Sequence, residues 1–406
     1  MKTEKTGYVV LSRLTNASDP AVHVGCLSRS ETQCHDFELS LWLMEAGVAF
    51  RRQHFTKIRA RKRFFLLALT LIAVQHQLSS RRVRPEPPLI PPERFNFQNM
   101  NEGDELRYFR FTQEEIRDLI IRFRLPDVMK TPERDRFFHY EGLCILLYRL
   151  HYPSRYSDMV KIFGRASGPL CRIANDMLDR LYDNYAHLLG FDFVRLTPAL
   201  LRFFAQVIHN KGSPYTTVFA FVDGTLRKCC RPIVFQDSLY NGWKKIHCIK
   251  FLSIVTPDGI IITLIGPWAG IAHDARMWAE SGVEDVLRAF CVTDDGVQLA
   301  LFGDAAFPRS ICMLGPFEGV VDVWRTAMNR QMSSLRESVE WMFNRVLQLF
   351  TYLDFSRNLK VLLSPIAKSY MVGALFTNIR TCMDGGNIVS DYFNCDPPEL
   401  GEYLHV

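Results

Sequence analysis

The sequence predicts a mixed α/β fold, preceded by a mostly helical region with a helix-turn-helix-like pattern. From residue 216 onward, short apolar runs typical of buried strands alternate with amphipathic stretches typical of helices. Before residue 210, apolar residues recur at helical spacing instead. The 406 residues are 48% hydrophobic and 23% charged, which is the composition of a globular protein rather than a disordered or fibrous one.

The helical region is predicted over residues 96–210, after an unassigned N-terminal region, 1–95, that ends in a proline-rich linker. Prolines interrupt helices and favour extended chain. Thr112 and Glu115 have the spacing of a capping box. A helix at 157–163, a glycine-containing turn and a long helix at 170–189 complete the helix-turn-helix-like pattern. It can be a DNA-reading motif or a packing module, and the aspartates of the long helix, which would repel phosphates, favour packing.

The α/β region is predicted over residues 216–380, followed by a C-terminal tail at 381–406. Its predicted elements are a strand at 218–222, hairpin strands at 246–255 and 260–265 around a Pro-Asp-Gly turn, a helix at 274–290, a strand at 298–302 and an amphipathic helix at 332–350.

Charge, cysteines and hydropathy exclude several classes of protein. The net charge is +6, and residues 51–84 hold ten Lys or Arg and no Asp or Glu. This patch suits a polyanion, while a solvated basic stretch or a nuclear-import signal is the alternative. Eleven scattered cysteines without a C-x-x-C pair indicate free thiols in a reducing compartment. The longest apolar run is shorter than the roughly 20 residues that a bilayer requires, and the N-terminus has no apolar signal core. We therefore expect a soluble protein with no membrane partner.

Three carboxylates stand where these elements could bring them together. Asp223 ends the first strand in FVDGT, Asp304 ends a later strand in LFGDAAFP, and Glu340 lies within the last helix. Adjacent strands are about 4.8 Å apart, so two such acids can share a cation and a packed helix can supply a third ligand. Clustered carboxylates require a counter-charge, and Mg²⁺ prefers oxygen ligands. The structural alternatives are an Asx turn for an Asp before Gly and an ion pair between Glu340 and Arg336.

The sequence motifs around these acids resemble those of the catalytic domain of PIF/Harbinger-type DDE transposases. They are, in order, FVDGT, CCRP, QDSLYNGWKKIHCIKF, TPDGIIITLIGPWAGIAHDARMW, LFGDAAFP and NRQMSSLRESVEWMF. The resemblance covers residues 216–380 and implies a ribonuclease-H-like core with a DDE triad. Matched residue by residue, the triad is Asp223, Asp304 and Glu340. Glu337 is the alternative third acid, but Glu340 is preferred because it lies between a Val and a Trp, as the third acid does in the family motif.

The resemblance also implies roles for other residues. Asp274, next to His273, is expected either to support the site or to cap the following helix. Around the second strand lies a polar and basic strip of Gln236, Tyr240, Lys244, Lys245, His247 and Lys250. We interpret Lys244, Lys245 and Lys250 as DNA-phosphate contacts, with plain surface charge as the alternative. His247 could support catalysis, but a hydrogen-bonded structural histidine is favoured.

From these patterns we expect a nuclear, metal-dependent transposase or endonuclease that uses Mg²⁺, with Mn²⁺ as a substitute. Its partners would be DNA, a Myb-like accessory DNA-binding protein and a second copy of the chain. In the basic patch, the candidate phosphate contacts are Arg59, Arg61, Lys62 and Arg63. One alternative is a domesticated DNA-binding scaffold without cleavage activity. Another is an α/β hydrolase using His273 with Asp274, which the absence of a G-x-S-x-G sequence disfavours.

Overall fold

The computed structural model describes residues 89–406. The basic patch at 51–84, including Arg59, Arg61, Lys62 and Arg63, lies outside the described residues. So does most of the proline-rich linker.

Helices dominate the chain up to residue 210. The elements are η2 (Phe97–Asn99), α3 (Glu102–Phe109), α4 (Gln113–Arg122), a hairpin of β1 (Val128–Lys130) and β2 (Arg136–Phe138), α5 (His139–His151), α6 (Tyr156–Phe163), α7 (Ser167–Tyr185), η3 (Ala186–Leu189) and α8 (Pro198–Asn210).

The predicted capping box is confirmed at the start of α4. The Thr112 side chain accepts a hydrogen bond from the Glu115 backbone N–H, and the Glu115 carboxylate accepts one from the Thr112 backbone N–H. The α6–turn–α7 pattern is also present, because α6 ends at Gly164 with φ 62° and α7 follows three residues later. The aspartates of α7 are paired within the protein: Asp176 binds Arg180 and Asp179 binds Lys368.

A mixed sheet forms the second half of the fold. Its strands are β3 (Val218–Lys228), β4 (Tyr240–Asn241), β5 (Ile246–Val255), β6 (Ile261–Ala269), β7 (Ala300–Phe302) and β8 (Met313–Leu314). They pair in the order β4-β5-β3-β7-β8, and β6 pairs with β5. The β3–β5 and β5–β6 pairs are antiparallel, whereas β3–β7 and β7–β8 are parallel.

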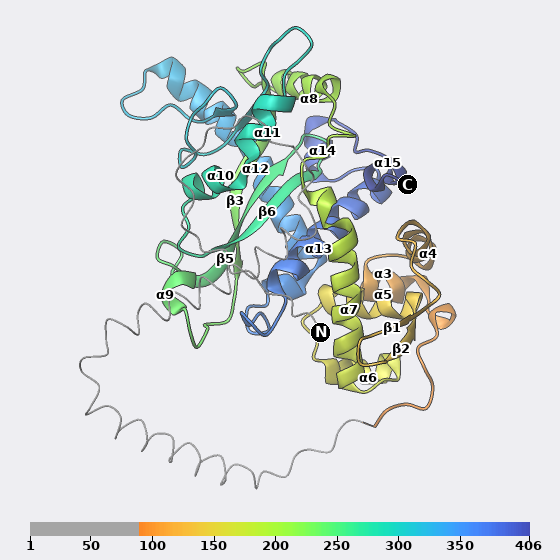
Figure 1. The fold of residues 1–406 in the computed structure, drawn as a ribbon. Helices are drawn as coiled ribbons and strands as arrows, with labels where there is room; N and C mark the ends of the chain where they lie inside the picture. Colours follow the sequence, from red (N-terminus) through yellow and green to blue (C-terminus); the bar gives the residue numbers. More distant parts are fainter. Residues whose placement is uncertain (1–88) are drawn as a thin grey trace, which may run out of the picture.

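The helices of this half interrupt and follow the strands. They are α9 (Gln236–Leu239), α10 (Asp274–Ser281), α11 (Val283–Phe290), α12 (Val323–Leu349), η4 (Thr351–Asp354), α13 (Ile366–Asp384), α14 (Ile388–Phe393) and α15 (Leu400–Leu404). α8 and α12 pack against β3, α10 packs against β5, and α13 packs against both β6 and α7 (Figure 1).

The mixed α/β prediction is confirmed, and the element boundaries differ in ways that have physical reasons. β3 continues past residue 222 because Asp223–Lys228 pair with β5. The helix expected at 274–290 is two helices, since Gly282 at the break has φ 68°. The expected C-terminal tail is instead folded: α13 ends within it, and α14 and α15 bury Val389, Phe393 and Tyr403.

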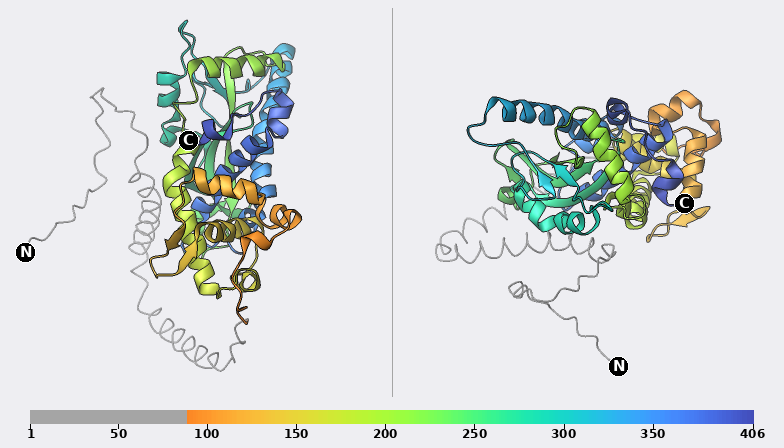
Figure 2. Two further views of the ribbon diagram at one scale, coloured as in Figure 1. Left: turned by 90° about the vertical axis from the view of Figure 1, so that its right-hand side faces the viewer. Right: turned by 90° about the horizontal axis from the view of Figure 1, so that it is seen from above.

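One continuous apolar core joins the helical and sheet-bearing parts. The right-hand view of Figure 2 shows the C-terminal helices, in blue, between the green sheet and the orange helices near residue 100. No helix within residues 89–406 has both the length and the apolar character needed to cross a membrane.

Candidate active site

The pairing of β3 with β7 brings two of the three predicted acids together. Phe221 of β3 is opposite Phe302 of β7 in parallel register, and Asp223 and Asp304 each lie two residues further along. Neighbouring strands are about 4.8 Å apart, so the two acids lie side by side, Asp223 within β3 and Asp304 just past the end of β7. Asp304 lies just past the end of β7, where its side chain accepts a hydrogen bond from the Ala306 backbone N–H at 3.0 Å.

Glycines next to the two aspartates allow neighbouring groups to approach closely. A Cβ at Gly303 would lie 2.8 Å from the Phe307 ring, and one at Gly224 would lie 2.7 Å from an oxygen of Asp274. Real Cβ atoms do not tolerate such contacts, so a side chain at either position would push the turn or the neighbouring carboxylate aside. Asp274 is thereby placed beside the backbone that follows Asp223.

The third acid, Glu340, is carried by α12. This helix buries Leu335, Val339 and Met342 and packs against β3. Glu340 itself is 53% exposed, and its partner is Arg336, one turn earlier, at 3.4 Å. The same guanidinium donates to Asp223 at 2.6 Å. Arg336 therefore links the helix acid to the strand acid, and the ion pair considered from the sequence is present together with a contact to Asp223.

Burial and charge perturb Asp223 strongly. Burial raises the pKa of Asp223 to about 6, the Arg336 guanidinium opposes this shift, and the charges of Asp304 and Glu340 add to it. The two other predicted acids thus act electrostatically on Asp223. A carboxyl group whose pKa is raised by burial and by neighbouring acids is a common property of functional sites.

The three acids match a divalent cation in their chemistry. Carboxylate oxygens are the ligands that Mg²⁺ and Mn²⁺ prefer, and a buried cluster of acids has excess negative charge for a cation to offset. As arranged, however, no three His, Cys, Asp or Glu side chains within residues 89–406 are close enough together to hold a metal ion. Asp223 and Asp304 suit a divalent cation as two of its ligands, whereas Glu340 is paired with Arg336.

Asp274 is held by a buried lysine. The Lys250 ammonium, on β5, donates to Asp274 at 2.5 Å and to the Ala272 carbonyl at 3.0 Å, and Lys250 is only 8% exposed. This contradicts the expectation that Lys250 contacts DNA phosphate, because its charge is already neutralised inside the protein. The N-cap of α10 is His273, which is exposed, so Asp274 is not the cap. Its binding to Lys250 also leaves the hydrolase alternative without support.

The other residues of the basic strip lie at the far end of β5. Lys244 and Lys245 are exposed in the turn that precedes β5. His247 is partly buried, pairs with Tyr240 of β4 in the sheet and has its ring 5.3 Å from the Tyr240 ring. Gln236 accepts a hydrogen bond from Arg231. Within residues 89–406, no hydrogen bond or ion pair joins these residues to the three acids, so a supporting role for His247 remains a prediction.

Sequence reasoning missed that Arg336 reaches Asp223. The spacing of four residues between Arg336 and Glu340 indicates their own pairing, and it carries no sign of a partner 113 residues away. A signal did exist in the excess of acids: three clustered carboxylates require a positive charge, and Arg336 is the nearest one along the chain to Glu340.

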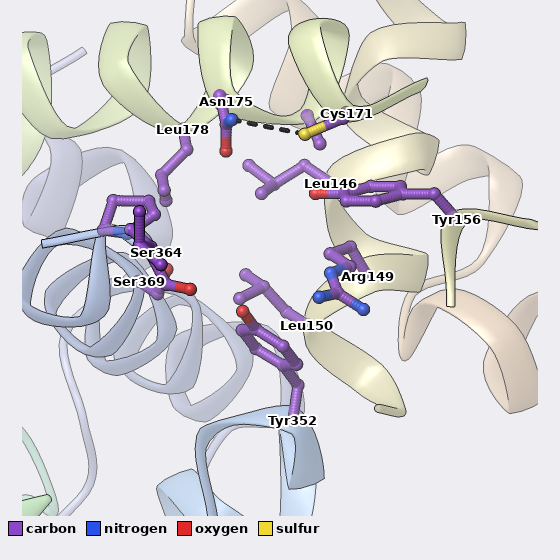
Figure 3. A pocket seen from close by; sticks show the side chains of 13 residues that line it. Leu146, Arg149, Leu150, Tyr156, Cys171, Asn175, Leu178, Tyr352, Ser364 and Ser369 are labelled. Carbon is purple, nitrogen blue, oxygen red and sulfur yellow. Dashed lines mark hydrogen bonds between the residues drawn. The ribbon is translucent and has the colours of Figure 1, made fainter. Parts of the chain in front are cut away.

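A separate cavity of about 120 Å³ lies between α5, α6 and α7 on one side and η4, the chain before α13 and α13 itself on the other. The Arg149 guanidinium lies over the rings of Tyr156 and Tyr352, at 4.6 Å and 4.3 Å (Figure 3). Leucines form much of the remaining wall. This cavity contains none of the three acids and belongs to the packing between the two halves of the fold.

A family model matches part of the sheet-bearing half of the chain. Residues 222–378, from the end of the apolar part of β3 to α13, match the model of a family described as DDE superfamily endonuclease. The matched range contains Asp223, Asp304 and Glu340, and it supports a DDE-type transposase-like domain. Such a family suggests nuclease or transposase activity on DNA, and DDE endonucleases generally use divalent metals. No curated protein and no solved structure matched the chain.

Proposed function

We propose that this protein is a metal-dependent DNA endonuclease of the transposase type, built on a ribonuclease-H-like core. It would cleave phosphodiester bonds at the ends of a mobile element and join the freed 3′-hydroxyls to target DNA. The observation that carries the proposal is the parallel register of β3 and β7, in which Asp223 and Asp304 each follow a paired phenylalanine by two residues. Both lie inside the range that matches the endonuclease family.

The chain's own residues would bind the cation, position the substrate and exclude bulk water. Asp223 and Asp304 would hold a divalent cation, Mg²⁺ or Mn²⁺, with Glu340 as the third ligand. When bound, such a cation polarises the phosphodiester and activates the attacking water or 3′-hydroxyl. Asp223 is 14% exposed, so water has limited access on its side. Arg336 balances part of the acid charge and lies where a phosphate oxygen could also accept its hydrogen bonds.

Plasmid nicking tests this proposal. Purified full-length protein should convert supercoiled plasmid to nicked circles in Mn²⁺, and EDTA should stop the reaction. Asp304→Ala should abolish nicking, because the cation would lose one of its two strand-borne ligands. Asp127→Ala, which removes a 96% exposed carboxylate in the helical half of the fold, is the matched control and should retain activity. Nicking by the Asp304 variant at the wild-type rate would refute the proposal.

Further parts of the proposal concern subtype, location and partners. The sequence motifs and their order along the chain support membership of the PIF/Harbinger type. For this type we expect a nuclear location, a Myb-like accessory DNA-binding protein and a homo-oligomer on two element ends. Because α7 packs against α5, α6 and α13, we assign it a packing role, and the partner would supply the recognition of DNA sequence. Fluorescence microscopy of the tagged full chain checks the nuclear location, and exclusion of the chain from the nucleus would contradict it.

The alternative is a domesticated DNA-binding scaffold that retains the fold without cleavage. The observation that favours it is the engagement of Arg336 by both Asp223 and Glu340, which gives two of the three acids a partner within the protein. DNA retention on a gel without metal-dependent nicking, unchanged in Asp304→Ala, would support the scaffold over the enzyme.

A further inference from the structure

The turn between β4 and β5 is a well-defined structure on the surface. Asn241 accepts a hydrogen bond from the Lys244 backbone N–H at 2.9 Å and donates one to the Gly270 carbonyl at 3.0 Å. Lys245 adopts a left-handed conformation with φ 55°. The turn is therefore tied both to itself and to the chain that follows β6, so its side chains are presented from a fixed backbone.

Trp243 stands out of this turn into solvent. It is 88% exposed, the highest value for a large aromatic side chain within residues 89–406, and Trp324 follows at 64%. An indole in water leaves a large apolar face unburied. Such a face on a fixed turn is suited to stacking against another flat, apolar surface.

The charge around Trp243 is positive. Residues 228–247 carry Lys228, Arg231, Lys244 and Lys245, all exposed, against a single acid, Asp237. Among the residues that the structure describes, none of these three lysines forms an ion pair. The surroundings of Trp243 therefore have an uncompensated positive charge, which complements a polyanion and disfavours a cationic or purely apolar partner.

The turn lies in line with the acid site. Asp223 is opposite Ser253 of β5, and β5 runs back from Ser253 to Ile246 beside the turn. At about 3.4 Å per residue, this places the turn roughly 24 Å from Asp223. A DNA strand advances by about 3.4 Å per nucleotide, so a strand crossing the acid site can reach the turn about seven nucleotides away.

We propose that Trp243 stacks on an unpaired base of a DNA strand whose phosphates are bound by Lys244 and Lys245. The inference rests on the proposed function, since the strand is the one that enters the acid site. Unpaired bases present a free face to an aromatic ring, whereas paired and stacked bases do not. The turn would thus select DNA that is opened or distorted near the site of cleavage. A surface of Trp and lysines could also bind an anionic membrane, but the shared strand β5 favours the nucleic acid.

Binding in EDTA, where no cleavage occurs, tests this inference separately from nuclease activity. Fluorescence anisotropy would compare full-length protein on labelled duplexes that are fully paired with duplexes that carry a four-base unpaired bubble. Wild type should prefer the bubble. Trp243→Ala should weaken bubble binding by about 5- to 150-fold and leave paired-duplex binding nearly unchanged. Trp243→Phe, which retains a ring, should keep most of the preference.

Two further variants complete the experiment. Trp324→Ala removes another exposed tryptophan and should have no effect on either DNA. The double variant Lys244→Gln with Lys245→Gln should weaken binding to both DNAs. The slope of the binding constant against salt concentration, on logarithmic axes, should fall by the amount expected for the loss of about two phosphate contacts. Equal bubble binding by Trp243→Ala and wild type would overturn the inference, even if the plasmid is nicked. The inference would also be overturned if Trp243→Ala lost binding to phosphatidylserine vesicles but kept its binding to the bubble DNA, because the turn would then be assigned to a membrane.

Discussion

Two carboxylate–guanidinium pairs in this molecule differ in burial and in charge balance. Arg195 and Asp258 are 3.0 Å apart with side chains 3% and 2% exposed, and Asp258 also accepts hydrogen bonds from the Thr256 hydroxyl and the Ile260 backbone N–H. Asp192, at 4.0 Å from Arg195, has His405 as a second partner at 3.1 Å. Arg336, in contrast, serves both Asp223 and Glu340, with Asp304 adding a further negative charge.

The difference distinguishes a structural pair from a site with chemical capacity. A buried acid whose hydrogen bonds are satisfied holds its turn in place and offers nothing to a ligand. Where β3 pairs with β7, two acids share Arg336 and the charge of Asp304 adds to theirs, so negative charge remains for a cation or for protons. Excess negative charge, rather than burial alone, marks the functional region where β3 pairs with β7.

The largest effect is expected on breaking the balanced pair. Arg195→Ala leaves Asp258 buried without its charge partner and should lower the free energy of unfolding by about 3–5 kcal/mol. Chemical denaturation followed by circular dichroism measures this. Arg202→Ala removes an exposed pair with Asp295 and should cost about 0–1 kcal/mol. Equal losses in the two variants would contradict the structural role of Arg195.

The next effect is a pH dependence that comes from Asp223. Its pKa is about 6 in the folded protein against an ordinary 3.8, so between these values the folded state retains a proton that the unfolded chain has released. The unfolding free energy should therefore fall as pH rises through this window, by about 2–3 kcal/mol, and stay level above it.

Asp223→Asn removes this titration and should flatten the profile. Denaturation curves at several pH values, for wild type and variant side by side, isolate the contribution of Asp223 from that of other groups. Identical slopes between pH 4 and pH 6 in the two proteins would show that Asp223 titrates normally.

The smallest effect is expected from Arg336→Gln. Because the pair reaches solvent, the loss in unfolding free energy should be about 1–2 kcal/mol. Only the attraction to Arg336 is removed, so the pKa of Asp223 should rise further and the pH window should extend upward. Arg325→Gln, on the same helix with an exposed partner at 3.9 Å, should leave the window in place. A downward movement in the Arg336 variant would mean that Arg336 does not stabilise the Asp223 carboxylate.

Local features were predictable from the sequence because local interactions determine them. The Thr112–Glu115 box and β5 at 246–255 depend on neighbours a few residues away. α13 was missed because it is buried over most of its surface, and a helix that is apolar all round lacks the periodicity of an amphipathic one.

The candidate site was predictable only in part. Asp304 follows the end of a strand and Glu340 lies in a helix as predicted, whereas Asp223 lies within β3 instead of at its end. The approach of the three acids depends on the pairing of β3 with β7 and the packing of α12. Lys250 was placed on the surface because lysines are usually exposed, and only the tertiary contact with Asp274 explains its burial. Long-range contacts of this kind leave no trace in local spacing.

The parallel pairing of β3 with β7 has a consequence for biosynthesis. The two strands are joined only after the chain between them has emerged and crossed over, and α12, which carries the last acid, is made later still. Such non-local pairing forms slowly compared with helices and hairpins. A ribosome-bound chain that ends before residue 340 therefore has an incomplete set of acids, and the full set first exists outside the ribosome once residue 340 has left the exit tunnel.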